Sequence, residues 1–376
     1  MSYYMGFWEK LKKPIYALAP MADVTDAAFR QLIARKSKFD KKGGNTGAEY
    51  VSWTEFVSAD GLALAPEEGR QKLMKALLYS EIERPIVAQF FGSNPDHMEA
   101  AARLALELGF DGVDINMGCP DRSIEKQGAG AAMIKTPEVA REIIRAVKRG
   151  ARLPSSTTSV NGGQATQGDK QIPVSVKTRL GYNKDELDTW LLVLLEEKPA
   201  AVTIHARTRK EMSKVPAHWN RIKDAVDIRN EMGSKTLIIG NGDLGTLSDG
   251  DQKIQETGAD GVMFGRGVFG NPWFFNKELV SDDEVALPVR GQTEGDKVRY
   301  SNTKISQEDR LKTLLEHAEL FDEFLGDTKS FAVMKKHVKA YISGFLGAKE
   351  IRDQLMQTKD LQEFRNSLKI YKLATD

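Results

Sequence analysis

Short apolar runs, rich in β-branched residues, recur through the first two-thirds of the chain. Runs of this length that are bounded by glycine, proline and polar residues predict β-strands. We predict eight such strands, at residues 15–19, 48–54, 85–91, 113–115, 173–177, 201–205, 236–240 and 261–265.

The segments between these runs have the periodicity of amphipathic helices. Thr25 or Asp26 can cap the first helix, and Asn94 followed by Pro95 has the order typical of a helix start. Strands and helices that alternate at a spacing of roughly 30–40 residues predict an α/β fold, a (β/α)8 TIM barrel. No G-x-G-x-x-G motif opens a helix after the first strand, which disfavours a doubly wound sheet. The predicted helices are residues 27–36, 66–78, 95–108, 136–149, 185–197, 218–232 and 247–257.

Two boundaries divide the chain into three segments. Residues 1–280 hold the predicted barrel, and residues 154–171 form a polar, small-residue tract within it that we expect to be a surface insertion. Residues 281–305 are polar, charged and turn-rich, and are typical of a linker. Residues 306–376 lack a convincing strand, and their apolar spacing predicts a small helical domain.

The overall charge is nearly balanced, at +1, with 41% hydrophobic and 28% charged residues. Residues 328–372 nevertheless contain ten lysines and arginines and only four acidic residues, a local excess that is typical either of phosphate contacts or of an ordinary solvated helical face. The first 13 residues lack a signal-peptide core, and no apolar run approaches the ~20 residues of a membrane span. We therefore expect a soluble, cytoplasmic monomer without a metal.

Polar or glycine-rich residues follow the predicted strands at their carboxyl ends, which on a barrel meet at one mouth where active sites lie. Each residue alone has an ordinary explanation, such as solvation of Lys177 or loop capping by His205. Together they predict an active site. These strand-end residues are Pro20, Met21, Ala22, Gln89, Asn116, Cys119, Lys177, Arg179, His205, Arg207, Asn241, Gly242, Asp243, Gly265 and Arg266.

Cys119 is the only cysteine of the chain and stands between Gly118 and Pro120. A lone cysteine is most often a buried apolar residue. A core strand does not need a residue between two backbone breakers, so we predict a reactive side chain here. The small residues at 127–132 would let the backbone approach a ligand closely.

The glycine-rich ends of the seventh and eighth strands predict a phosphate site, with Arg266 as a charged partner. Lys177 and Gln89, across the mouth, suit the polar edge of a flat ring. A phosphate beside such a ring suggests FMN. The same residues also suit a phosphorylated substrate, with Lys177 as a Schiff-base nucleophile.

Taken in order, the motifs of residues 15 to about 275 resemble the tRNA-dihydrouridine synthases, and the tail at Met334-Lys-Lys-His-Val-Lys-Ala-Tyr341 resembles the helical domain of that family. The combination is specific, whereas each motif alone would be weak. The motifs are Ala19-Pro-Met-Ala22 with Thr25-Asp26, Thr54-Glu55, Gln89-Phe-Phe-Gly92, Asp114-Ile-Asn-Met-Gly-Cys-Pro120, Lys126-Gln-Gly-Ala-Gly130, Val176-Lys-Thr-Arg-Leu-Gly181, His205-Ala-Arg-Thr208, Gly240-Asn-Gly-Asp243 and Gly265-Arg-Gly267.

The resemblance implies an FMN enzyme that reduces the C5–C6 bond of a uridine in tRNA, with NADPH as electron source and Cys119 as general acid. Cysteine suits this role because its reference pKa of ~8.5 leaves it protonated at neutral pH. The target base must leave the tRNA stack to enter a barrel mouth. The residues implied to contact FMN are Pro20, Met21, Ala22, Gln89, Lys177, His205, Asn241, Gly242, Asp243, Gly265 and Arg266, and those expected to contact the substrate are Asn116, Arg179, Arg207, Lys335, Lys336 and Lys339.

The sequence departs from the family pattern at Arg122-Ser123 and at Lys335, where the family often has two lysines and an arginine, and in the insertion at 154–171. Three other functions fit parts of the chain. They are a flavin oxidoreductase for a small pyrimidine or enone, a phosphate-binding lyase or aldolase without flavin, and a tRNA-binding module. The basic tail disfavours the first, a visible spectrum separates the second, and the placement of Cys119 disfavours the third.

Overall fold

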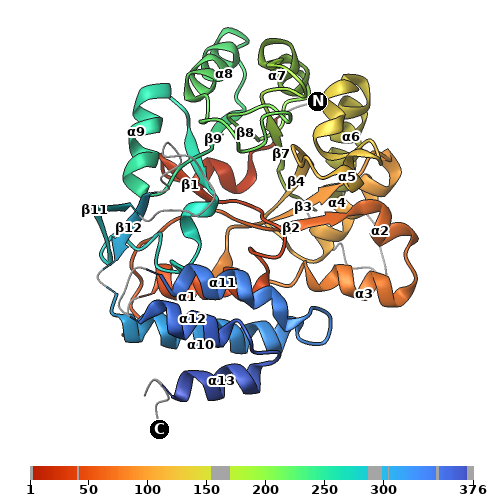
Figure 1. Cartoon of the computed structure of the whole chain (residues 1–376). Coiled ribbons are helices and arrows are strands. Elements are labelled where there is room, and N and C mark those ends of the chain that lie inside the picture. The colour runs from red at the N-terminus through yellow and green to blue at the C-terminus, as the bar shows by residue number, and fades with distance from the viewer. Residues whose placement is uncertain are drawn as a thin grey trace, which may run out of the picture.

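The computed structural model describes residues 3–39, 42–153, 170–286, 299–303, 305–343 and 347–370. Eight parallel strands form one sheet in the order β1-β10-β9-β8-β7-β4-β3-β2 (Figure 1). Ala17 forms a parallel bridge with Val51, directly before β2, and this bridge closes the sheet into a barrel. The barrel strands are β1 (Ile15–Leu18), β2 (Ser52–Ser58), β3 (Ile86–Phe91), β4 (Gly112–Met117), β7 (Val174–Arg179), β8 (Ala201–His205), β9 (Leu237–Asn241) and β10 (Gly261–Phe264).

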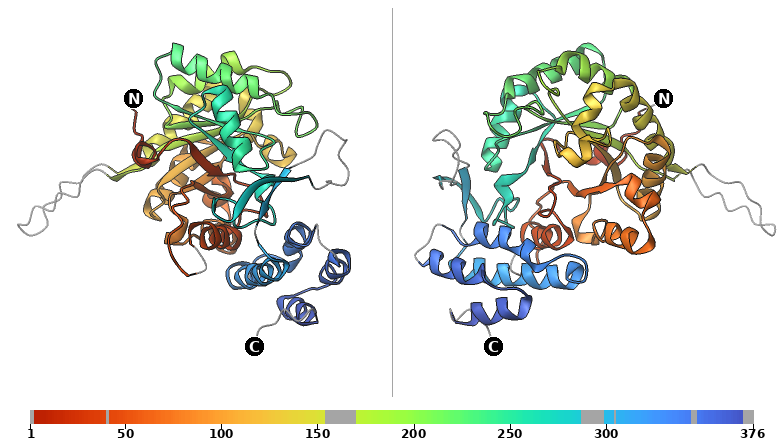
Figure 2. Two further views of the ribbon diagram at one scale, coloured as in Figure 1. Left: turned by 90° about the vertical axis from the view of Figure 1, so that its left-hand side faces the viewer. Right: turned by 45° about the vertical axis from the view of Figure 1, so that its right-hand side comes forward.

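Helices surround the strands, so that both faces of most strands are buried (Figures 1 and 2). This burial explains why the strands appear in the sequence as continuous apolar runs. The helices of this part are α1 (Ala27–Lys38), α2 (Ala59–Leu64), α3 (Glu67–Lys75), α4 (Pro95–Glu107), α5 (Arg122–Glu125), α6 (Pro137–Gly150), α7 (Leu187–Glu196), α8 (Trp219–Glu231) and α9 (Leu247–Thr257), with short 3₁₀ turns at Gly6–Lys10, Glu81–Glu83, Gly130–Lys135 and Arg266–Val268.

The barrel prediction is confirmed for all eight strands, and two of the predicted caps are present. Asp26 accepts a hydrogen bond from the N–H of Phe29, and Asn94 accepts one from Asp96. The second strand was placed too early, since β2 begins at Ser52, and the short helix α2 was missed. A register shift between Trp53 and Phe56 interrupts the regular alternation of β2, which explains the error.

The N-terminal end of the barrel is filled by side chains. Trp8, from the first 3₁₀ turn, is 3% exposed and packs against Trp53 with ring centroids 6.0 Å apart. Ile15, Val87 and Ile239 belong to the same core cluster. The interior of the barrel is thus closed at this end by Trp8 and Trp53, and the carboxyl ends of the strands lie at the opposite end.

The segment predicted as a linker contains strands. β11 (Val280–Ala286) and β12 (Arg299–Thr303) pair in antiparallel fashion. Local composition does not predict them, because both strands consist largely of polar and charged residues. The polar tract at 154–171 lies mostly outside the described residues, and its flanks β5 (Arg152–Leu153) and β6 (Lys170–Gln171) form a second antiparallel pair.

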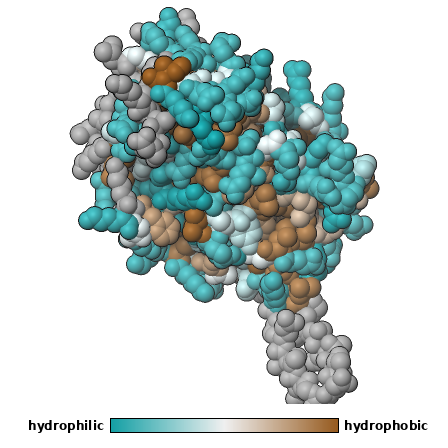
Figure 3. Space-filling model, turned by 90° about the horizontal axis from the view of Figure 1, so that it is seen from below, coloured by the Kyte–Doolittle hydropathy of each residue, from teal (hydrophilic) through white to brown (hydrophobic). Residues whose placement is uncertain are grey.

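Four α-helices follow in the described part of the C-terminal region, and they pack on the barrel instead of standing apart. Ala28 and Leu32 of α1 share a core cluster with Leu311, Leu314 and Phe321. Viewed from below, the surface is mostly hydrophilic, with scattered hydrophobic side chains (Figure 3). The helices are α10 (Gln307–Leu325), α11 (Met334–Tyr341), α12 (Ala348–Leu355) and α13 (Leu361–Lys369), with a 3₁₀ turn at Phe331–Val333.

Candidate active site

The strand-end residues predicted from sequence come together at one mouth because neighbouring strands bring them into register. Asn116 of β4 lies beside Lys177 of β7, and Arg179 lies beside His205 of β8. His205 in turn lies beside Asn241 of β9. Residues separated by more than 120 positions in the chain therefore form a continuous polar arc.

The turn that carries Cys119 is held by its own backbone contacts. The Asn116 side-chain oxygen accepts hydrogen bonds from the N–H groups of Gly118 (3.1 Å) and Cys119 (2.9 Å). The Cys119 carbonyl accepts one from Ala131 at 2.9 Å, and Arg179 Nε donates to the Gly118 carbonyl at 2.8 Å. The position of the thiol is therefore set before any substrate arrives.

Apolar side chains surround the Cys119 thiol on one side. Phe91, Ile124 and Ala129 form a buried cluster, and Phe56 and Cys119 pack against it. This burial raises the pKa of Cys119 above its ordinary value. The thiol is consequently protonated at neutral pH, as a proton donor must be.

A buried polar network lies beneath the mouth. Gln89 is fully buried, its amide nitrogen donates to Asp114 at 2.6 Å, and its oxygen accepts from Asn116 at 3.0 Å. Ser175 donates to the other Asp114 oxygen at 2.5 Å. Burial raises the pKa of Asp114 to about 6. In the structure, Gln89 holds the side chain of Asn116 in place. Its predicted contact with FMN stays a prediction.

Sequence reasoning missed Asp114 and Ser175 as parts of this network. The available signal was the carboxylate of Asp114 inside an otherwise apolar run, between Val113 and Ile115. A buried carboxylate requires hydrogen-bond partners, and neighbouring strands are where such partners are found.

Lys177 and Asn241 carry polar groups into the mouth. Lys177 Nζ lies 3.4 Å from the Asn241 side-chain oxygen, and the Asn241 amide donates to the Met263 carbonyl at 2.8 Å. Burial, assisted by the nearby charge of Arg179, lowers the pKa of Lys177 to about 8. Lys177 remains mostly protonated at neutral pH and has a defined orientation.

Arg207 acts on His205. It is 1% exposed and donates to the Val215 carbonyl at 2.6 Å, to His205 Nε2 at 3.1 Å and to the Asp243 carboxylate. Since Nε2 accepts that bond, the hydrogen of the neutral imidazole is on Nδ1. Burial and the charges of Arg179 and Lys177 hold the pKa of His205 well below its usual value.

The predicted substrate contacts of Arg179 and Arg207 are not visible in the structure. Arg179 is 7% exposed and also donates to the carbonyls of Thr208 and Met212, each at 3.2 Å. Both guanidinium groups support neighbouring loops, and a direct contact with substrate stays a prediction for each.

The loops after β9, β10 and β1 adjoin one another. A Cβ atom placed on Gly265 would lie 3.6 Å from the Met21 sulfur, and one on Gly267 would lie 2.6 Å from the Leu244 carbonyl oxygen. Gly242 has φ +136°, and a Cβ there would lie 2.8 Å from Ala217 Cβ. Arg266 extends beside this backbone, 41% exposed and 3.1 Å from an Asp243 carboxylate oxygen. Three adjoining loops with small residues and one partly exposed cation suit a phosphate group.

The predicted tRNA-binding lysines lie on α11. Lys336 and Lys339 are exposed and Lys335 is half-buried. Lys336 Nζ is 3.3 Å from an Asp23 carboxylate oxygen. In the described part of the chain, no acidic residue forms an ion pair with more than one of these three lysines.

Within the described residues, no helix is long and apolar enough to cross a membrane.

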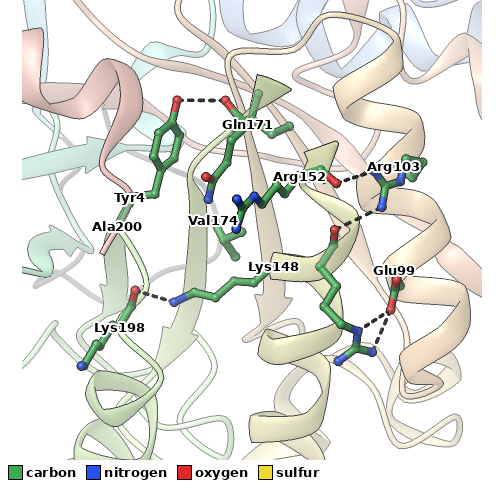
Figure 4. A pocket seen from close by; sticks show the side chains of 11 residues that line it. Tyr4, Glu99, Arg103, Lys148, Arg152, Gln171, Val174, Lys198 and Ala200 are labelled. Atoms are coloured by element: carbon green, nitrogen blue, oxygen red, sulfur yellow. Dashed lines mark hydrogen bonds and ion pairs between the residues drawn. The ribbon is translucent and has the colours of Figure 1, made fainter. Parts of the chain in front are cut away.

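A basic pocket of about 590 Å³ lies at the opposite end of the barrel, near the start of β7 (Figure 4). Two of the cations that line it, Arg103 and Lys148, donate hydrogen bonds to main-chain carbonyls. Arg103 donates to the carbonyls of Arg149 and Arg152, and Lys148 donates to those of Glu197 and Lys198. These contacts stabilise the carboxyl ends of helices, where cations are favourable. The pocket lies outside the active site, which is at the other end of the barrel.

Comparison with known proteins identifies relatives along the whole chain. A family model described as "Dihydrouridine synthase (Dus)" matches residues 17–375. A Staphylococcus aureus (strain COL) protein named "Probable tRNA-dihydrouridine synthase" is 34% identical over 373 residues, with 99% of this chain and 97% of that protein covered. The "Probable tRNA-dihydrouridine synthase 2" of Bacillus subtilis (strain 168) is 34% identical over 362 residues, with 96% and 94% covered.

Similar solved structures are more distant. An old yellow enzyme homologue from Zymomonas mobilis has a TM-score of 0.41 at 14% identity, over 76% of this chain and 94% of that chain. Histamine dehydrogenase from Rhizobium sp. 4-9 has a TM-score of 0.47 at 13% identity, over 70% of this chain and 45% of that chain. The family model and the curated relatives decide the assignment, because both extend over nearly the entire sequence. The chain belongs to the dihydrouridine synthase family.

Proposed function

We propose that this protein is a cytoplasmic, monomeric tRNA-dihydrouridine synthase that binds FMN, takes electrons from NADPH and uses Cys119 as its general acid. The observation that carries the proposal is the placement of Cys119, in a turn whose backbone is held by hydrogen bonds, at the barrel mouth of a member of this family. A nucleophilic cysteine would need a lowered pKa, whereas burial raises the pKa of this one.

The residues at the mouth fit a flavin. Arg266, which is 41% exposed and paired with Asp243, offers a cation for the phosphate beside the loop of Gly242. Lys177 and Asn241 are polar groups suited to the edge of the flavin ring, and the loop with Met21 adjoins Gly265. FMN held there in its reduced form would supply the hydride for C6 of the uracil ring.

The chain's own residues complete the reaction. As negative charge develops at C5 and O4, the S–H group of Cys119 donates its proton to C5, so that one hydride and one proton saturate the C5–C6 bond. The raised pKa of the thiol then favours recovery of a proton from solvent. We propose that Asn116, whose side chain is fixed by Gln89 and by the Cys119 turn, contacts the edge of the base.

The test is to incubate unmodified tRNA with the protein, FMN and NADPH and to map dihydrouridine along the product. We expect dihydrouridine at discrete positions, release of FMN on denaturation, and no product with Cys119→Ala. Turnover of free uridine at a rate equal to that of tRNA would instead favour a small-substrate oxidoreductase. A colourless protein that cannot be reconstituted with FMN would overturn the flavin assignment.

A further inference from the structure

One lysine of the C-terminal region reaches two acidic side chains at the rim of the barrel mouth. Lys329, which follows α10, places Nζ 3.0 Å from each Glu55 carboxylate oxygen and 3.4 Å from an Asp23 oxygen. Asp23 lies in the loop after β1, and Glu55 lies within β2. We refer to Lys329, Glu55 and Asp23 as the rim cluster.

The local backbone directs both carboxylates toward this lysine. The register of β2 shifts between Trp53 and Phe56, and such a bulge redirects the side chains beside it. Asp23 has φ +52°, a conformation that is uncommon outside glycine, and its N–H donates to Glu55 at 2.6 Å. The acidic half of the rim cluster is thus built into the barrel.

The cluster is partly desolvated, which strengthens its interactions. The side chains of Glu55 and Lys329 are 7% and 24% exposed. A buried carboxylate without a partner is costly, and Lys329 is the cation that compensates Glu55. Burial alone would raise the pKa of Asp23, but the charges of Lys329 and Lys336 hold it below its ordinary value.

The rim cluster connects two regions with different proposed roles. On the barrel side, the loop of Asp23 also carries Pro20, Met21 and Ala22, which are proposed to contact FMN. On the other side, α11 with its exposed lysines begins at Met334, only a few residues after Lys329. The apolar contacts of α1 with α10 and α11 lie in a separate cluster, which does not include the rim.

We infer that Lys329 is a positioning residue, which holds the basic helix α11 at a fixed place relative to the barrel mouth. The inference rests on the proposed function, because its consequence is that a base displaced from tRNA bound to α11 reaches Cys119. An ammonium group that is occupied by Glu55 and Asp23 is unavailable to an RNA phosphate. Lys329 therefore acts through the cluster, and not by contact with RNA.

A double-mutant cycle tests this inference. The variants are Lys329→Met, Glu55→Gln and the double variant, with KM and kcat measured for tRNA and the rate of NADPH-dependent flavin reduction measured alongside. We expect each single variant to lower kcat/KM for tRNA by about 10-fold to 100-fold, the scale of a misplaced substrate. The double variant should be no worse than the poorer single variant, since both remove the same contact.

A direct phosphate contact by Lys329 predicts a different pattern. Glu55→Gln would then leave tRNA affinity unchanged or improve it, and Lys329→Met would reduce the salt dependence of tRNA binding by about one charge. Lys339→Met, a change of an exposed lysine on α11, is the matched control and should show that reduced salt dependence. The same reduction in Lys329→Met would overturn the inference.

Two further variants guard against simple misfolding. Lys329→Arg keeps the charge and should restore most of the tRNA kcat/KM, and Asp23→Asn, at a half-exposed position, should give a weaker form of the same defect. Retained flavin content and flavin reduction in every variant would show that the barrel is intact. Additive effects in the cycle would refute positioning by Lys329, whereas a wild-type protein that does not modify tRNA would refute the proposed function itself.

Discussion

A pair of buried histidines makes the junction between the barrel and the C-terminal helices sensitive to acid. His317 of α10 and His337 of α11 are 0% and 1% exposed, with ring centroids 4.3 Å apart. Phe29 of α1 packs on both rings, at 5.2 and 5.0 Å. Within the described part of the chain, neither nitrogen of His317 nor Nε2 of His337 has a hydrogen-bond partner. Protonation would therefore place a poorly compensated charge in an apolar core.

The size of the effect follows from the pKa of His337. Burial and the nearby charge of Lys336 lower that pKa from 6.5 to about 3. The folded protein then binds fewer protons at this site than the unfolded chain does, so the stabilisation is complete above pH ~6.5 and is lost as the pH falls toward 3. At about 1.4 kcal/mol per pH unit, lowering the pH from about 7.5 to about 5 costs about 2 kcal/mol from His337 alone. Burial and His337 shift the pKa of His317 in the same direction.

Urea unfolding at these two pH values, followed by tryptophan fluorescence at saturating FMN, measures the effect. The pKa values of Asp26 and Asp114 are raised to about 6. Protonation of these two carboxyl groups stabilises the folded protein as the pH falls, which opposes the loss from His337. The contribution of His337 is therefore obtained from the difference between variants. His337→Leu should lose about 2 kcal/mol less than wild type over this range. His218→Gln, which changes a histidine whose side chain is 42% exposed, should follow wild type. An equal loss in wild type and His337→Leu would refute the reasoning.

Three further outcomes are expected. Cys119→Ser should leave flavin reduction by NADPH near wild type and slow single-turnover oxidation by tRNA by roughly 10²–10⁴-fold, and equal effects on both steps would remove Cys119 from catalysis. Gly242→Val should abolish FMN retention with little change in circular dichroism, because its Cβ would crowd Ala217 at 2.8 Å. Replacing residues 154–169 with a short Gly-Ser link should preserve tRNA modification, because the flanking β5–β6 pair precedes β7 at the N-terminal end of the barrel and loop length contributes little to closure entropy. Loss of modification with FMN still bound would contradict that placement.

The barrel could be predicted because its signals are local. Most strands are mainly apolar runs that end at a glycine, a proline or a polar residue, and the caps Asp26 and Asn94 lie next to the helices they begin. Strand order around a barrel follows chain order, so the convergence of Asn116, Lys177 and His205 at one mouth also follows from sequence.

What could not be predicted depends on contacts between distant residues. The pairing of β11 with β12 bridges a polar segment, and the shifted register of β2 is decided by its partner β3. The hydrogen bonds from Arg179 and Arg207 to loop carbonyls could not be predicted either, because composition does not reveal the paths of those loops. The predicted contacts of both residues with the substrate stay predictions. The ion pair between Lys329 and Glu55 spans 274 positions and leaves no local trace in the sequence.

The environment of Cys119 also separates a proton donor from a nucleophile. Lys177 and Arg179 lie close enough for their charges to favour a thiolate, yet the pKa of the thiol is raised, because burial outweighs both cations. Arg179 donates hydrogen bonds to the carbonyls of Gly118, Thr208 and Met212, and Lys177 Nζ lies close to the side-chain oxygen of Asn241. The cations thus fix the shape of the mouth while the apolar cluster of Phe91, Ile124 and Ala129 sets the protonation state of the thiol. It follows that replacing Phe91 with a polar residue should lower the pKa of Cys119, whereas changes to Arg179 should act mainly through the geometry of the Cys119 turn.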